Sequence, residues 1–198
     1  MSAISSHEPD ENAEFGDKFN AALGNLVIKW NRAELHLRWL LDSFIGGPNA
    51  LVVTSELGAV GLANALRTFA NETTSGPLRE AIIHLLDYTD TTRAYRNYYV
   101  HGVVVLKNIN SAEVGYVQTF SAKGSMTKHH EQVSIEQIDK IAAHAVILAD
   151  YALAVLHHSV DPSDDIPKLP EPPPLPEKLK KPRQSLQWLW QPPQSSPA

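Results

Sequence analysis

The sequence predicts a mainly α-helical domain, a four-helix bundle with a β-hairpin inserted between the third and fourth helices and a proline-rich C-terminal tail. Apolar residues recur at helical spacing over most of residues 14–160. β-branched and aromatic residues interrupt this pattern at 103–120. Of the 14 prolines, 11 lie between Pro162 and Pro197. The chain therefore divides into an acidic, flexible N-terminus (1–13), a helical domain (14–160) and an extended tail (161–198).

The first three helices are predicted from apolar stripes and stop signals. The first stripe ends at Gly46-Gly47-Pro48 and consists of Phe15, Phe19, Leu23, Leu26, Trp30, Leu37, Leu41 and Phe44. A weaker second helix is predicted from about Asn49 to Asn71, with Gly58 and Gly61 lowering its intrinsic stability. The third follows Ser75-Gly76-Pro77 and extends to His101.

A hairpin and a fourth helix complete the predicted domain. Residues 103–107 and 114–120 are typical strands joined by a polar turn, and 121–128 is predicted to be a mobile return loop. Ser134 and Gln137 have capping-box spacing, and Val133 and Ile138 can form the accompanying hydrophobic staple. The fourth helix therefore begins next to Ser134.

Composition excludes several kinds of site and function. The chain has no cysteine, which excludes disulfides, thiolate metal sites and cysteine nucleophiles. The net charge is −5, but residues 18–160 balance at 12 acidic and 12 basic side chains. That balance argues against broad, charge-driven nucleic-acid binding and leaves a small local site open. An N-terminus unlike a signal peptide, with no apolar run of about 20 residues, predicts a cytoplasmic protein without membrane association.

The third predicted helix carries polar side chains on its apolar face. With Ile82 as reference and about 100° per residue, Arg93, Arg96 and Asn97 fall within about 60° of the apolar direction. An unpaired buried guanidinium is costly, so these arginines should meet carboxylates or line a wet cleft or a subunit interface. Glu34, at the edge of the first helix's stripe, is a natural partner for them.

Arg96-Asn97-Tyr98-Tyr99-Val100-His101 resembles the R-x4-H signature of the HEPN superfamily, helical domains of higher eukaryotes and prokaryotes. The resemblance covers roughly residues 14–160 and includes the acidic position Glu34. It implies a homodimeric, metal-independent endoribonuclease without a cofactor, of the toxin or phage-defence kind, whose two motif helices form one composite site. His101 would move the proton of the ribose 2′-OH or of the leaving 5′-oxygen, and Arg96 would stabilise the phosphorane. Asn97 would orient the phosphate or the imidazole, with Arg93 and Glu34 in support.

Helical geometry also favours a dimer. Arg96 and His101 are five positions apart, or about 140° around the helix, so we expect one rigid helix not to aim both at one phosphate. Two antiparallel copies could do so.

Structural alternatives stay open for each of these features. Arg93 or Arg96 could form a partly buried ion pair with Glu34, while His101 caps a helix C-terminus. The protein would then be a non-catalytic HEPN-like interaction or nucleotide-binding module. Tyr98 could stack on a base or pack against the hairpin or a dimer mate. In the tail, Trp188 and Trp190 are either stray apolar residues of a solubilising segment, or they dock on this domain, its dimer mate or a protein partner.

Overall fold

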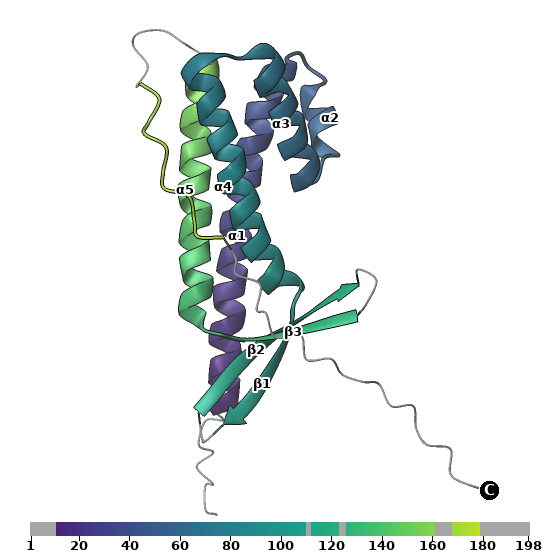
Figure 1. Cartoon of the computed structure of the whole chain (residues 1–198), viewed down its shortest axis with the longest axis vertical. Coiled ribbons are helices and arrows are strands. Elements are labelled where there is room, and N and C mark those ends of the chain that lie inside the picture. The colour runs from purple at the N-terminus through teal and green to yellow at the C-terminus, as the bar shows by residue number, and fades with distance from the viewer. Residues whose placement is uncertain (1–10, 110–111, 123–125, 161–167, 179–198) are drawn as a thin grey trace, which may run out of the picture.

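The computed structural model describes residues 11–109, 112–122, 126–160 and 168–178, with backbone only for 11–14 and 103–131. The protein is mainly α-helical, as predicted. Its long helices are α1 (Glu11–Ile45), α3 (Ala59–Thr73), α4 (Gly76–His101) and α5 (Ile135–Val160), and α2 (Ala50–Ser55) is a single short turn of helix. Figure 1 shows α1 and α5 running parallel along the molecule, with α4 returning antiparallel beside them.

Local sequence signals set most of the helix ends. Gly46 and Gly47 adopt positive φ values of 65° and 78°, a conformation that glycine tolerates, and they terminate α1. Gly76 has a φ of 59° where α4 begins, and Pro77 occupies its first turn. The single helix predicted from about Asn49 to Asn71 is wrong, because extended backbone at Gly58 (ψ 170°) divides it into α2 and α3.

Two hydrophobic clusters follow one another along the bundle. The main cluster joins the C-terminal halves of α1 and α5 to α3 and the start of α4, around fully buried residues such as Trp30, Leu37 and Leu66. The second joins the beginning of α1 and α5 to the end of α4, with Phe19, Tyr99 and Ile138 at its centre. The two clusters hold α4 in place along its whole length.

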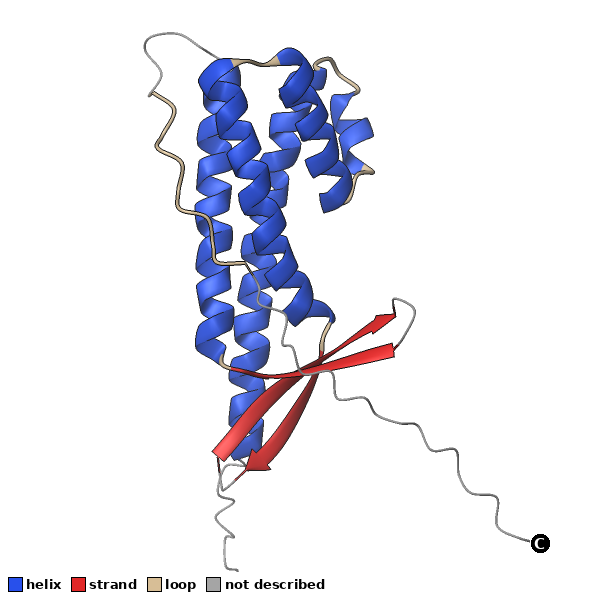
Figure 2. Ribbon diagram, in the orientation of Figure 1, coloured by secondary structure: helices blue, strands red, loops and turns tan. Residues whose placement is uncertain are grey.

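A three-stranded antiparallel sheet lies at the end of the bundle where α4 finishes (Figure 2). Its order is β1 (Val103–Ile109), β2 (Ala112–Ala122) and β3 (Met126–Val133). Val103 pairs with Gln118, and Gly115 pairs with Val133. The return loop predicted at 121–128 is therefore wrong in part, since residues 121–122 belong to β2 and 126–128 belong to β3.

The start of α5 has the predicted capping box. The backbone N–H of Gln137 donates to Ser134 Oγ at 3.2 Å, and the backbone N–H of Ser134 donates to Gln137 Oε1 at 3.0 Å. Among the described residues, α5 is the one helix long and apolar enough to cross a membrane by length and composition, a property that it shares with core helices of soluble bundles. Its buried residues pack in both clusters, which accounts for its apolar character.

Residues 168–178, here called the strap, cross the face of the bundle formed by α4 and α5 (Figure 1). The strap has no hydrogen-bonded secondary structure, in agreement with the extended tail predicted from its prolines. The strap also contacts the core, because Leu169 packs against the main cluster and Pro176 is buried. Trp188 and Trp190 lie outside the described residues, as do residues 1–10 of the predicted flexible N-terminus.

Candidate functional site

The polar residues of α4 lie just beyond the part of the helix that α3 packs against. Ile82, Leu85 and Thr89 are fully buried between α3, α1 and α5. Because α3 begins only at Ala59 and runs antiparallel to α4, the next turns of α4 have no helix above them. Arg93 and Arg96 are therefore only half-buried, although they continue the same stripe.

A pocket of about 300 Å³ occupies this position, between α1, the start of α3 and α4. Its lining combines the sequence-predicted Glu34, Arg93, Arg96 and Asn97 with residues that the sequence did not single out as functional: Trp30, Gly58, Ala59, Val60 and Gly61. The prediction that the arginines line a cleft is thus confirmed for both of them.

Arg96 contacts both other members of the R-x4-H motif. Its Nη1 donates to Asn97 Oδ1 at 2.9 Å and lies 3.3 Å from His101 Nε2. Although their Cα positions are about 140° apart around the helix, the long arginine side chain reaches the imidazole, so the two groups meet on one helix; whether both can reach one phosphate stays a prediction. A guanidinium has donors only, so this contact is a hydrogen bond when His101 Nε2 carries a lone pair.

Arg93 is paired, but not with Glu34. Its Nη2 donates to Asp90 Oδ1 at 3.0 Å, and Asp90 also meets Arg67 of α3 at 3.4 Å. Glu34 lines the same pocket without an ion pair to either arginine among the described residues. The alternative in which Glu34 forms an ion pair with Arg93 or Arg96 is therefore wrong. Asp90 lies one helical turn before Arg93 on the same helix and pairs with it instead.

Tyr98 belongs to the second hydrophobic cluster rather than to the pocket lining. Its ring lies edge-on to Tyr99 with centroids 5.2 Å apart. The structure thus brings together Arg93, Arg96, Asn97, His101 and Glu34 on one side of the bundle and places Tyr98 in the packing beside them.

The start of α3 contributes backbone groups to the pocket. Gly58 is its N-cap and provides no side-chain acceptor, and the first turn carries no acidic residue. The first intrahelical bond is donated by Leu62, so the N–H groups of the preceding turn have no acceptor within the helix. Arg38 of α1 fixes this corner by donating to the carbonyls of Thr54 and Leu57. In the sequence, Gly58 and Gly61 are the residues that could have indicated a break in the helix at this position.

No known protein identifies the site. The chain matches no protein-family model, no curated protein and no solved structure.

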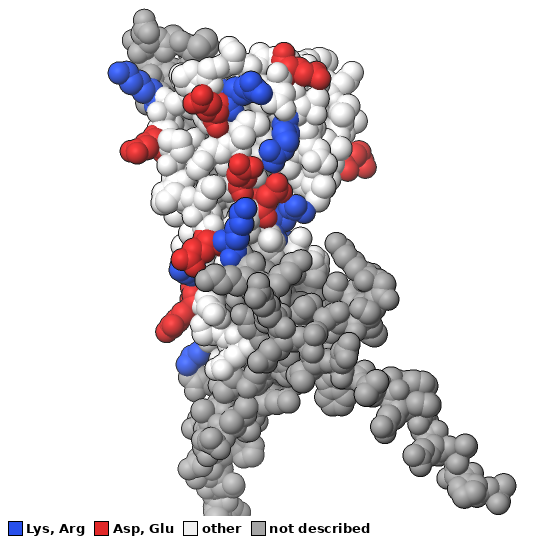
Figure 3. All heavy atoms as spheres, viewed as in Figure 1, with Lys and Arg blue, Asp and Glu red and all other residues white. Residues whose placement is uncertain are grey.

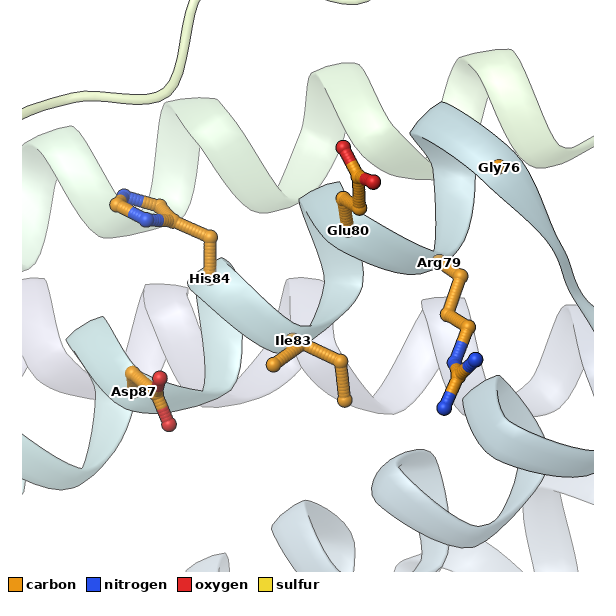
Figure 4. Close-up of a pocket in the computed structure, with 6 residues that line it drawn as sticks. All are labelled: Gly76, Arg79, Glu80, Ile83, His84 and Asp87. Carbon is orange, nitrogen blue, oxygen red and sulfur yellow. The ribbon is translucent and has the colours of Figure 1, made fainter.

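The opposite face of α4 carries a second concavity of about 420 Å³, lined by Arg79, Glu80, His84 and their neighbours. Figure 4 shows Arg79 pointing toward α3, where it donates to Asn71 Oδ1 at 2.9 Å, while Glu80 and His84 point toward α5.

A tyrosine and a histidine contact each other between α4 and α5, where the Tyr88 hydroxyl lies 2.7 Å from His144 Nδ1. Burial raises the pKa of Tyr88 to about 12, and burial together with Lys140 lowers the pKa of His144. Both groups are therefore neutral near pH 7.

Proposed function

We propose that the protein is a HEPN-like, metal-independent endoribonuclease that cleaves RNA by attack of the ribose 2′-OH at a site built from Arg96, Asn97 and His101. The observation that carries this proposal is the direct contact of Arg96 with both Asn97 and His101 at the rim of a solvent-accessible pocket. An imidazole can transfer a proton and a neighbouring guanidinium can stabilise the developing phosphorane charge, which are two of the contributions that phosphodiester cleavage uses.

The chemistry follows from these contacts. In the reaction the 2′-oxygen bonds to phosphorus and the bond from phosphorus to the 5′-oxygen breaks, leaving a 2′,3′-cyclic phosphate and a 5′-OH. His101 Nε2 accepts the 2′-OH proton, and the Arg96 guanidinium turns from His101 toward the phosphorane, whose charge it neutralises. Asn97 gives up its contact with Arg96 and then binds either a phosphate oxygen of the substrate or the imidazole of His101.

Two further features of the pocket favour an anion, although the carboxylate of Glu34 also lies in its lining. Arg93 adds a second guanidinium to the lining, and the start of α3 contributes uncapped N–H groups at the positive end of its helix dipole. The face in Figure 3 shows acidic and basic side chains interspersed rather than a continuous basic surface. Such a surface suits a short RNA segment held at one or two phosphates rather than a long duplex.

A homodimer completes the mechanism. Transfer of one proton away from the 2′-OH and delivery of another to the leaving 5′-oxygen need a base and an acid at the same time. One chain supplies a single histidine, His101, in this motif. A second copy meeting the first at the ends of their α4 helices would supply the other, which is the composite arrangement that the resemblance implies.

The test is cleavage of a defined RNA oligonucleotide by His101→Ala. We expect loss of cleavage with an unchanged circular-dichroism spectrum, since a helix-terminal histidine contributes only about 0.3 to 2 kcal/mol to stability. His157→Ala, at the exposed last turn of α5, is the matched control and should cleave like the wild type.

The substrate offers further controls. EDTA should leave the rate unchanged, and an oligonucleotide with a single 2′-deoxy substitution should resist cleavage at that position alone. Cleavage that survives His101→Ala, that needs a divalent metal, or that proceeds at the 2′-deoxy position contradicts the mechanism.

A second candidate function is a non-catalytic HEPN-like module that binds a protein partner or a nucleotide. It is favoured by the same triad contacts, because Arg96, Asn97 and His101 satisfy one another without a substrate. In that case the wild type is inactive against RNA at any concentration, and His101→Ala changes only stability.

A further inference from the structure

The conformation of the strap is set by its own sequence. Every residue from Leu169 to Pro176 is a proline or directly precedes one. Proline fixes φ near −65°, and the residue before a proline is restricted to extended conformations. The strap is therefore held close to polyproline II geometry before it meets the bundle, so its docking costs little conformational entropy.

The strap follows α4 in register over a long distance. Leu169 shares a concavity with Ala81 near the start of α4, and Glu177 reaches Tyr95 close to its end. Eight residues of polyproline II cover about 25 Å. The 14 helical positions between Ala81 and Tyr95 cover about 21 Å. An extended strap is thus matched in length to the groove that it occupies.

Aromatic donors of α4 bind the backbone of the strap. His84 Nε2 lies 2.8 Å from the carbonyl oxygen of Pro173, and Tyr95 Oη donates to the carbonyl oxygen of Glu177 at 2.8 Å. A polyproline II chain makes no internal hydrogen bonds, and its prolines have no N–H, so its carbonyls are the groups open to recognition. Aromatic-lined grooves recognise proline-rich peptides by this chemistry.

The floor of the groove is built to receive the strap. Tyr151 of α5 is buried and meets the His84 ring edge-on, with centroids 5.9 Å apart and planes at 84°. Tyr151, Ala81 and His84 on the bundle side and residues 169–172 on the strap side together line a concavity of about 390 Å³. Leu169 reaches the main cluster and Pro176 is buried, whereas Leu175 remains 47% exposed. The strap therefore presents one face to the bundle.

We propose that the groove between α4 and α5 is a recognition site for proline-rich peptides in the polyproline II conformation, and that the strap is its resident, exchangeable ligand. The ligand class is an extended peptide with a leucine for the apolar end of the groove and prolines along the His84 to Tyr95 interval. This site is separate from the Arg96 pocket, which is lined by α1, the start of α3 and α4 and shares no lining residue with the groove. The proposal thus does not depend on ribonuclease activity.

The experiment separates the strap from the bundle after folding. In the full chain, residues 161–167 are replaced by a seven-residue recognition sequence for a specific protease, and the folded protein is cleaved there. Gel filtration at micromolar concentration should show the C-terminal fragment eluting with the bundle. A fluorescently labelled synthetic peptide of residues 168–178, followed by anisotropy, should bind the cleaved protein saturably and displace the fragment.

Two variants that keep an aromatic ring at each position but remove its hydrogen-bond donor test the two contacts. Tyr95→Phe and His84→Phe each remove one hydrogen bond, so each should weaken peptide binding roughly threefold to tenfold. His157→Ala is a control outside the groove and should bind like the parent. A peptide with its prolines replaced by alanine should bind far more weakly than the native sequence.

Three results overturn the proposal. In the first, the cleaved fragment elutes separately from the bundle and the peptide does not bind up to millimolar concentration. In the second, the proline and alanine peptides bind equally well. In the third, the affinity for the peptide is unchanged in both Tyr95→Phe and His84→Phe.

Discussion

Replacing Arg96 by alanine tests how the motif helix is stabilised. If Arg96 neutralised a buried carboxylate such as Glu34, the substitution would strand that charge and cost about 3 to 5 kcal/mol. In the structure the two hydrogen-bonding neighbours of Arg96 are the neutral Asn97 and His101. Among the described residues no carboxylate forms an ion pair with it. The contacts thus predict a much smaller effect.

The magnitude follows from the groups removed. Each of the two hydrogen bonds contributes roughly 0.5 to 1.5 kcal/mol. Against this, Arg96 Nε is buried without a hydrogen-bond partner in the described part of the chain, and removing it relieves a desolvation cost of about 1 to 3 kcal/mol. We therefore expect Arg96→Ala to lower the free energy of unfolding by less than about 2 kcal/mol.

Urea unfolding followed by circular dichroism measures this difference, with an unchanged m-value as the check on two-state behaviour. Arg93→Ala is the matched control. It leaves Asp90 with Arg67 at 3.4 Å and removes only a part-exposed pair, so its cost should also be small. A loss of 3 kcal/mol or more in Arg96→Ala would refute the reasoning, because it would require a buried charge that depends on Arg96.

Three further predictions concern stability. The pKa of His144 is lowered in the fold, so its contribution to stability is present above its unfolded pKa of about 6.5 and should be lost as pH falls below that value. Burial raises the pKa of Tyr88 and of Tyr151, which predicts a loss of stability above about pH 10 that Tyr88→Phe should reduce, with Tyr151 accounting for the remainder. Chemical denaturation between pH 5 and 11 measures both effects. Ser134→Ala should cost about 1 kcal/mol in the same assay by removing the cap of α5, and an unchanged stability would contradict the capping role. Deletion after Val160 should leave a folded domain but lower its melting temperature by about 2 to 8 °C, since the lost strap contacts are worth roughly 1 to 2 kcal/mol. Calorimetry showing an unchanged melting temperature would contradict the docking of the strap.

Short-range signals were sufficient for much of the fold. The end of α1 at Gly46 and the start of α5 at Ser134 depend on groups within four residues of each other, so the sequence alone predicted them. The same is true of the polar stripe on α4, because helical periodicity places Arg93 and Arg96 on one face whatever surrounds them. The sequence left a carboxylate partner, a wet cleft or a subunit interface open for the two arginines, and the structure places both of them, with Asn97, in the lining of a pocket.

The tertiary structure decided which groups meet. The length of the Arg96 side chain, rather than the angle between the Cα positions, brings Arg96 into contact with His101. The part of α4 that α3 does not cover is set by the residue at which α3 begins. The corner at Gly58, next to which Arg38 of α1 binds the carbonyls of Thr54 and Leu57, and the docking of the strap both involve contacts between different segments of the chain. A sequence pattern records what each residue favours locally, whereas such contacts exist only once the helices have packed and their loop-closure entropy has been overcome.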